Sequence, residues 1–527
     1  MNAPADTQTQ YTGGSNKWVV AMTVMLGTFV AVMDISVVNV ALPHMMGTFG
    51  QSQSAITWIA TSYSIAEIIM ATMAGWWSTL LGRKRLFIIS FIVFTIGSIL
   101  CGLATTFPQI LCFRILQGIG GGSLIPVSQA IMREAFPDEE QGMAMAVYGM
   151  GVVLAPAIGP ILGGWLTDHY GWEWIFFINV PIGVLGIFLI KIIVYDPPYL
   201  RRGLRRIDWI GIILLSFTLT LLQIVLERGE QKNWFESDWI VAGTVVCGIT
   251  LIALIGWELY THEPVVDVRL LRNVPLSVGS LIVLIFGIGL FGTTFLLPQF
   301  TQNLLGYTAY DSGLVLFPRA FSLFLFMPVV GWLYKRLNIR LMVGFGLAAI
   351  VYSYFLLARI SLQASFSTLT PLLLIMGIGM PFVFVTLTTV SLSTVPRSSM
   401  TEASSLYTLA RRIGGNIGYA LAASVVANRI QFHHTRLVEH TTSGNPAFLT
   451  LKQQMANLLL RSGTDPVTAG LKTNMIIDGL VNRQARMMAY NDTSLIFGLL
   501  FLVVMPLLLL IPSRKKLVRE SSPAPDG

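Results

Sequence analysis

A small set of ionisable residues lies within long apolar stretches of this chain, where charged side chains are rare. They are, in chain order, Asp34, Glu67, Arg114, Arg319, Arg411 and Arg412. An unpaired charge inside a membrane costs several kcal/mol, so such residues usually have partners and carry function. A carboxylate in that setting can take up and release a proton, and an arginine can hold the carboxylate or an acidic ligand. These residue types therefore point to transport chemistry.

Asp34 and Arg114 are predicted to form a buried pair. Counted from the same side of the membrane, Asp34 lies ~13 Å deep and Arg114 ~9 Å deep at the helical rise of 1.5 Å per residue. Two interpretations stay open at this point. The pair either couples protonation of Asp34 to a change of conformation, or it is a static ion pair that fixes helix packing.

Glu67 is predicted to lie in the middle of its span, as a second proton or cation site or as half of a structural ion pair. Arg319 follows Pro318 near the midplane of another span. We expect both to face a central cavity, because exposure to lipid at that depth would be costly. Arg319 would then either pair with Glu67 or bind an acidic group on the cargo.

Other polar residues could line the same cavity. The candidates are Asn39, Tyr63, Gln129, Gln299, Tyr407 and, with the arginines above, Arg319 and Arg411. We expect no cofactor and no metal, since the cysteines and the adjacent His433 and His434 have no ligand spacing. There is no GxxxxGK[ST] motif for ATP and no arrangement of nucleophile and base, so we expect no enzymatic activity.

The elements that must position these residues are membrane-spanning helices. The chain of 527 residues is 54% hydrophobic and only 11% charged, about half the charged fraction of a soluble domain. Each apolar stretch is long enough to cross the ~30 Å hydrocarbon core. We place fourteen spans at 18–43, 54–79, 84–106, 108–133, 142–166, 173–195, 207–227, 238–260, 274–300, 309–334, 339–360, 368–395, 402–430 and 490–512.

Basic residues are concentrated in alternate loops, for example at 83–85, 201–206, 335–340 and 514–519. This is the positive-inside pattern, so the net charge of +8 indicates membrane orientation and lipid contact rather than nucleic acid. Both termini are predicted to be cytoplasmic, which an even number of spans satisfies. We expect a multi-pass membrane protein, and the family resemblance set out below implies the bacterial inner membrane.

The family resemblance set out below implies two six-helix bundles with two further spans between them. We expect a cytoplasmic tail (1–17), a first bundle (18–195), a linker with two extra spans (196–260), a second bundle (261–512) and a second cytoplasmic tail (513–527). The second bundle includes a long polar outer loop, 431–489.

That loop carries an apolar stripe at helical spacing, formed by Leu451, Met455, Leu458 and Leu459. We expect short helices that cap the outer face. The stripe would cover either the transporter itself, as a lid, or a partner protein.

Glycine and proline cluster in three spans. Gly159, Pro160, Gly163 and Gly164 are the clearest group, and they indicate close helix packing or bending that suits a protein rocking between two states.

Five motifs occur in the order found in one known family. They are residues 32–43 (VMDISVVNVALP), 75–85 (GWWSTLLGRKR), 114–122 (RILQGIGGG), 159–164 (GPILGG) and 172–183 (WEWIFFINVPIG). Together they resemble the fourteen-helix drug:proton antiporters of the major facilitator superfamily. Residues 207–208, 226–229 and 233–235, with the outer loop, resemble the EmrB-type multidrug efflux permeases most.

The resemblance implies a major facilitator fold and alternating access driven by protons. It implies export of amphipathic or hydrophobic drugs within a tripartite pump, with a periplasmic adaptor and an outer-membrane channel as partners. Asp34, Arg114 and Glu67 are the residues we assign to proton coupling. The rivals are a dedicated exporter of one metabolite, such as a siderophore or fatty acid, and a sensor or scaffold that no longer transports.

At one place the chain departs from the family pattern, and at another only one of two neighbouring residues matches it. Thr79 and Leu80 stand where the loop motif has an acidic and a basic residue, which puts the usual cytoplasmic latch in doubt, so Arg83 is expected only to help orient the protein. Of the two adjacent arginines, Arg411 matches the pattern. Arg412 is therefore expected to reach the membrane surface or contact lipid.

Overall fold

The computed structural model is helical throughout the residues it describes, 16–196, 207–442 and 445–511. Thirteen of its helical segments are long and apolar enough to cross a membrane. The helix α16 (Met400–Val438) is not among them, but it packs along α3 and α12 inside the bundle. The predicted span 402–430 falls on this helix, and a total of fourteen spans stays a prediction.

The helix bounds agree closely with the predicted spans. The first group comprises α1 (Lys17–Phe49), α2 (Gln53–Ile56), α3 (Trp58–Leu81), α4 (Arg83–Gly102), α5 (Phe107–Gly122), α6 (Leu124–Ala135), α7 (Gln141–Tyr170), α8 (Trp174–Phe177) and α9 (Asn179–Ile193). The extra pair is α10 (Trp209–Arg228) and α11 (Asp238–Tyr260). The last group comprises α12 (Val274–Asn303), α13 (Ala309–Leu333), α14 (Ile339–Leu357), α15 (Phe366–Ser393), α16, α17 (Pro446–Arg461) and α18 (Pro466–Val504). Short 3₁₀ turns lie at Asp138–Glu140, Glu230–Lys232, Trp234–Glu236, Val268–Arg272, Arg397–Ser399 and Met505–Leu510.

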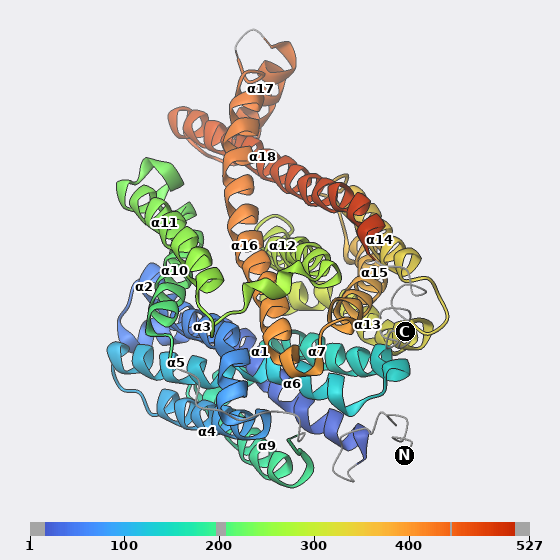
Figure 1. Ribbon diagram of the computed structural model, residues 1–527. Helices are drawn as coiled ribbons and strands as arrows, with labels where there is room; N and C mark the ends of the chain where they lie inside the picture. The colour runs from blue at the N-terminus through green and yellow to red at the C-terminus, as the bar shows by residue number, and fades with distance from the viewer. Residues whose placement is uncertain (1–15, 197–206, 443–444, 512–527) are drawn as a thin grey trace, which may run out of the picture.

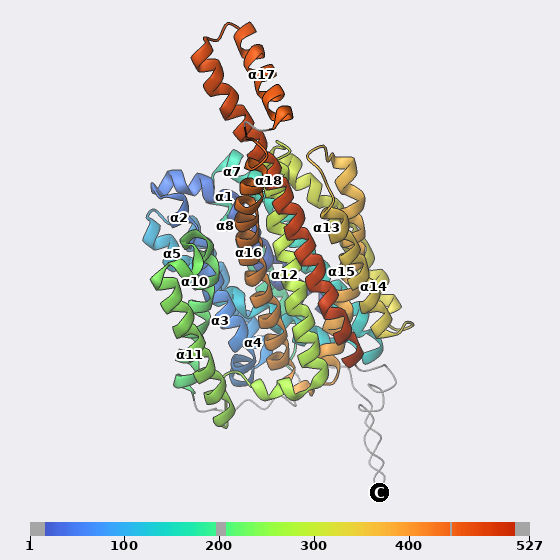
Figure 2. The ribbon, with the colours of Figure 1, turned by 90° about the horizontal axis from the view of Figure 1, so that it is seen from above.

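Helices α1 to α9 pack mainly with one another, as do α12 to α18 (Figure 1). The two groups meet along two seams. At one seam α7 packs on α13 and α15, and at the other α3 and α6 pack on α16. Helix α10 lies over the second seam, in contact with α3 and α16, while α11 packs on α10 at the edge (Figure 2).

Helix α5 comes unusually close to α3 because it presents glycine to it. A Cβ atom added to Gly118 would lie 2.5 Å from the carbonyl oxygen of Tyr63, and one added to Gly122 would lie 2.4 Å from that of Glu67. Small residues allow such backbone approach in membranes. The backbone around Glu67 is therefore held firmly from one side.

The predicted glycine–proline group of α7 is a packing site against α1. A Cβ at Gly159 would meet the Cβ of Ser36 at 2.7 Å, and one at Gly163 would meet the carbonyl oxygen of Val37 at 3.0 Å. The close packing that the sequence indicates is present. A part in rocking between states stays a prediction.

The region predicted as an outer loop is helical, but it does not cap the bundle. Helix α16 continues beyond the predicted end of its span to Val438, and α18 begins at Pro466 instead of 490. Together with α17 they form a hairpin that projects from one end of the molecule (Figure 2). Asn445 and Asp465 cap α17 and α18 by accepting hydrogen bonds from their first N–H groups, and a proline follows each cap, so two separate helices are strongly specified.

We call the end from which α17 projects the hairpin end, and the opposite end, which carries Arg83, Arg269 and Arg340, the basic end. His433, near the hairpin end of α16, is buried rather than exposed, because its ring contacts Asp492 of α18 at 2.7 Å. Most of the two predicted tails (1–17 and 513–527) lies outside the described residues, and so does the whole basic segment 201–206.

Candidate functional site

Asp34 lies in the interior of the first helix group with every oxygen engaged. Its Oδ2 accepts a hydrogen bond from Nη1 of Arg114 at 2.6 Å. Its Oδ1 accepts from the side-chain amides of Gln117 at 2.8 Å and Asn179 at 2.9 Å. The predicted pair between α1 and α5 is therefore present, and its carboxylate is fully buried and accepts hydrogen bonds from three side chains.

Arg114 makes further contacts within the same helix group. Its Nε donates to the carbonyl oxygen of Ile59 at 3.1 Å, and Nη1 also donates to Gln117 at 2.8 Å. The guanidinium lies 4.2 Å from the centre of the Tyr63 ring, close enough for a cation–π contact. All these partners belong to the first helix group, so the geometry favours the interpretation of Asp34–Arg114 as a structural strut.

Gln117 and Asn179 are site residues that the sequence analysis did not assign. Both bind Asp34, and both also share the hydroxyl of Ser98, at 3.2 and 3.1 Å. The sequence did contain a signal for their role, because each lies inside one of the quoted motifs, 114–122 and 172–183. Amides in otherwise apolar motifs can be expected to bind the buried charge nearest in depth.

Glu67 forms an ion pair with Arg412, and this pair joins α3 of the first group to α16 of the second. Glu67 is 2% exposed, so neither lipid nor bulk water surrounds it. Two expectations are corrected here. Arg412 does not reach for lipid but pairs with Glu67, and Arg319 is not the partner of Glu67.

A second polar group lies at the same boundary between the helix groups. Gln129 of α6 accepts a hydrogen bond from Thr408 of α16 at 3.4 Å, and the hydroxyl of Tyr407 lies 3.1 Å from that of Thr388 in α15. Arg411 lies 5.6 Å from the ring centre of Phe384. Three predicted cavity residues, Gln129, Tyr407 and Arg411, are thus brought together.

Arg319 is buried in the second helix group, apart from Glu67. It is 9% exposed, and its Nη2 donates to the hydroxyl of Thr294 at 3.0 Å. Its Nη1 is buried without a hydrogen-bond partner, and no carboxylate within the described part of the chain forms an ion pair with it. Gln299 lies half-buried on the same helix as Thr294, whereas Asn39 is exposed on α1, so these two do not join the central group.

The basic end holds a latch that the sequence put in doubt. Arg83 is 1% exposed and pairs with Glu134 of α6. It also donates across to the second helix group, to the hydroxyl of Thr401 at 2.7 Å and the carbonyl oxygen of Arg397 at 2.8 Å. Arg83 therefore joins the two helix groups at this end while it pairs with Glu134, and it does more than orient the protein.

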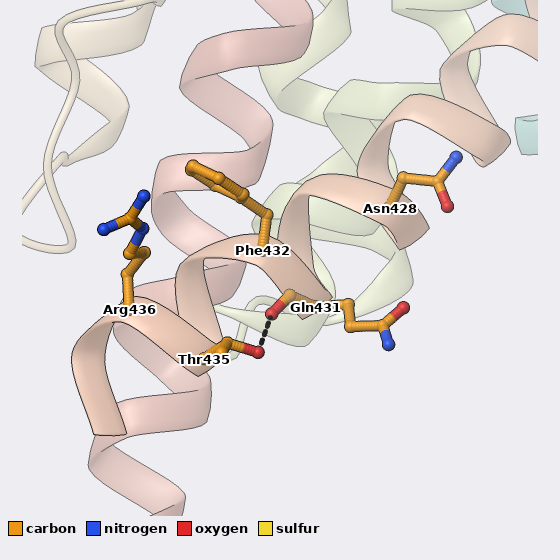
Figure 3. Close-up of a pocket in the computed structure, with 5 residues that line it drawn as sticks. All are labelled: Asn428, Gln431, Phe432, Thr435 and Arg436. Atoms are coloured by element: carbon orange, nitrogen blue, oxygen red, sulfur yellow. Dashed lines mark hydrogen bonds between the residues drawn. The ribbon is translucent and has the colours of Figure 1, made fainter. Parts of the chain in front are cut away.

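A surface hollow on the hairpin end of α16 lies away from these charges. Its lining residues, drawn in Figure 3, all come from one helix, and Thr435 there donates to the carbonyl oxygen of Gln431 at 3.0 Å. A shallow depression on one helix lacks the converging groups that hold a solute. We do not assign the transport site to it.

Two helix groups of membrane-spanning length, joined by a buried ion pair across their boundary, define a polytopic transporter. The chain belongs to the Major Facilitator Superfamily, whose family model matches residues 24–419. Its fold is also that of solved members of that superfamily. The human organic anion transporter MFSD10 superimposes with a TM-score of 0.60 at 15% identity, covering 93% of this chain and 99% of its own. The proton:xylose symporter XylE gives 0.60 at 14% identity, covering 95% and 97%.

Within the superfamily the chain is similar to the EmrB-type multidrug efflux permeases. It is 36% identical over 433 residues to the multidrug export protein EmrB of Haemophilus influenzae, covering 82% of this chain and 84% of that protein. It is 34% identical to EmrB of Escherichia coli K12, covering 84% and 87%. The fatty acid resistance protein FarB of Neisseria gonorrhoeae is 30% identical, covering 94% and 96%.

The strut interpretation of Asp34 is testable by stability. Replacing Asp34 with Asn leaves Arg114 buried without a counter-charge, which typically costs ~3–5 kcal/mol. We expect a markedly lower thermal midpoint of the Asp34→Asn protein in detergent. The double variant Asp34→Asn/Arg114→Gln should recover part of that loss, because no charge is then left uncompensated. If Asp34→Asn melts like the parent and only proton-driven transport is lost, Asp34 is a titrating group and not a strut.

Proposed function

We propose that this protein is a proton-coupled antiporter that exports amphipathic or hydrophobic compounds, including drugs, from the cell. The observation that carries the proposal is the Glu67–Arg412 ion pair, which joins the two helix groups deep in the membrane. The similarity to EmrB multidrug export proteins supports the direction and the class of cargo.

Glu67 is the better candidate for the coupling carboxylate. When Glu67 takes up a proton, the attraction to Arg412 is lost and the buried arginine is left without its counter-charge. That change favours an arrangement in which α3 and α16 separate and Arg412 finds water or another partner. Asp34, in contrast, is held by groups that move with it, so protonating it would not bias one helix group against the other.

The same logic assigns a role to the basic end. Arg83 holds α4 to Thr401 and Arg397 of the second group while Glu67 holds α3 to α16 further along the same seam. Opening the basic end must break both. The positive-inside pattern supports a cytoplasmic location for this end and for both termini, in the inner membrane of a bacterium.

Arg319 supports a cargo with an acidic group. It is a buried cation whose Nη1 lacks a hydrogen-bond partner, and a carboxylate or other acid on the cargo would supply both the missing acceptor and the counter-charge. An acidic amphiphile would suit this site. The similarity to FarB, a fatty acid resistance protein, favours a second candidate function, dedicated export of one acidic lipid-like compound.

The hairpin supports a partner outside the membrane. Leu451 and Leu458 of α17 are 41% and 66% exposed, and on α18 Leu471 and Met475 are 59% and 73% exposed. Apolar side chains on a projecting hairpin are poorly placed as a lid, since they cover no other part of the chain. They suit a periplasmic adaptor with an apolar helical surface, which would link the pump to an outer-membrane channel.

Coupling through Glu67 is tested in proteoliposomes. Glu67→Gln keeps the shape and an acceptor for Arg412 but cannot lose or gain a proton, so we expect efflux driven by a pH gradient to fall by about tenfold or more. The control is Glu139→Gln, at an exposed carboxylate of the basic end, which should transport normally. Unchanged driven efflux in Glu67→Gln would exclude Glu67 from the coupling.

The role of Arg319 is tested by comparing cargo of opposite charge. Losing a hydrogen bond to a charged group costs ~1.5–3 kcal/mol, so Arg319→Gln should raise the KM for acidic compounds by roughly 10- to 100-fold. Cationic compounds should be exported as well or better, because a repulsive charge has been removed. Arg359→Gln, at an exposed arginine, is the control. An equal loss for both classes of cargo would indicate a structural role.

Docking through the hairpin is tested by substituting its exposed leucines. In cells, Leu451→Glu with Leu458→Glu should reduce adaptor co-purification and resistance together, since central apolar contacts often carry ~1–2 kcal/mol or more each. The control places the same charge beside them, at the exposed Gln453 and Gln454. Substrate binding by the purified pump should not change. Full resistance and normal co-purification in the leucine variant would argue against docking at this face.

A further inference from the structure

Helix α10 contributes a carboxylate to the seam between α3 and α16 that the coupling scheme above does not use. Glu227 lies one residue before the end of α10 and accepts a hydrogen bond from the hydroxyl of Thr61 in α3. One turn deeper, Gln223 of α10 accepts a hydrogen bond from the side-chain amide of Asn416 in α16. The inserted helix is thus bonded to both helix groups by polar side chains.

These contacts continue the line of the Glu67–Arg412 pair. Gln223 and Glu227 are four residues apart on α10, and Arg412 and Asn416 are four residues apart on α16. Each interval is one helical turn, about 6 Å along the axis. From the hairpin end inward, the order is therefore Glu227 with Thr61, then Gln223 with Asn416, then Arg412 with Glu67. We call these three polar contacts the ladder and each contact a rung. They follow one another in a region where lipid-facing helices carry apolar side chains.

The charges around Glu227 leave its carboxylate without a salt-bridge partner in the described chain. Its neighbour Arg228 is turned away, with Nη1 on the carbonyl oxygen of Ser54 at 2.9 Å and Nη2 on the hydroxyl of Thr57 at 3.2 Å. From α3 and α16 the charged groups near this line are Glu67 and Arg412, two contacts deeper, and Arg411, which also acts electrostatically on Glu67. Glu227 is half-buried, so it lies between the solution at the hairpin end and the buried pair.

We propose that Glu227 is the proton entry residue, which takes up protons at the hairpin end and passes them along this ladder to Glu67. The inference rests on the proposed proton coupling, and it gives the inserted pair of helices a function. The amides of Gln223 and Asn416 both donate and accept hydrogen bonds, so they can hold the water that carries a proton across the remaining gap.

The transfer is balanced as follows. The Glu227 carboxylate binds a proton from solution and becomes a neutral acid. It then releases that proton through bridging water to the Glu67 carboxylate, which becomes neutral and frees Arg412, while Glu227 returns to its charged form. Gln223 and Asn416, which lie between the two carboxylates, keep their charge unchanged. The proton leaves towards the basic end when Glu67 ionises again.

A static alternative predicts different kinetics. If Glu227 only ties α10 to α3, its loss should weaken every transport mode in proportion to the loss of structure. If it is the entry residue, its loss should slow only those modes that require a proton to arrive from the hairpin end. Substrate exchange at equal pH on both sides requires the substrate-loaded protein to rock, but needs no net proton movement.

The experiment compares these two modes in proteoliposomes containing the full-length protein. Glu227→Gln keeps an acceptor for Thr61 but cannot carry a proton. We expect pH-driven efflux to fall by about tenfold or more, with substrate exchange at equal pH close to that of the parent. Glu227→Asp, which keeps the acid on a shorter side chain, should restore much of the driven efflux. Glu236→Gln, at an exposed acid of the same α10–α11 connection, is the matched control.

Each outcome decides one point. Normal driven efflux in Glu227→Gln overturns the entry role. Equal loss of driven efflux and exchange, with a lowered thermal midpoint, also overturns it in favour of a structural tie. If transport by the parent protein does not depend on the pH gradient, the proposed function fails. If the parent is coupled to the gradient and Glu227→Gln transports normally, only the proton-entry role of Glu227 is rejected.

Discussion

The cost of an unpaired charge in hydrocarbon governs the interior of this protein. A buried charge is stabilised best by an opposite charge, and that partner can belong to the same helix group or to the other one. Asp34 and Arg114 are matched within one helix group, by partners that all belong to that group. Glu67 and Arg412 are matched across two groups, so their attraction depends on how those groups are arranged. Arg319 has one buried N–H donor without a hydrogen-bond acceptor among the described residues.

The inserted helices make the two seams between the groups unequal. The seam of α3 and α16 is covered by α10, whose Leu215 and Leu219 join an apolar cluster with residues of both helices. At the seam of α7 and α13, Gly149 of α7 faces Met327 of α13, and Gly142 faces Tyr334, which follows the last residue of α13. A Cβ atom at either glycine would come within 3 Å of these side chains. The polar contacts of α10 therefore lie inside protein, where a hydrogen-bonded line can persist without exposure to lipid.

Much of this architecture follows from the sequence because membrane thickness fixes helix length. The span 238–260 coincides with α11, and depth alone paired Asp34 with Arg114. The rotation of each helix is what the sequence does not specify. Arg411 and Arg412 point about 100° apart on one helix, and which of them meets Glu67, 345 residues away in the sequence, depends on packing that no local pattern encodes. Likewise, an apolar stripe in 449–460 predicts a helix, but it does not say whether that helix folds down onto the bundle or stands away from it.

The hairpin is not joined to the bundle by a flexible tether. Helix α16 runs without interruption from Met400, beside the latch at the basic end, through Arg412 and out to Val438. A helix of 39 residues is about 58 Å long, so each degree by which it tilts about its inner end moves its outer end by about 1 Å. The same continuous helix that holds the buried arginine is therefore also a lever. A small tilt of α16 at the ion pair would be enlarged at the surface where the hairpin stands, so a partner bound there would be displaced much more than the ion pair itself.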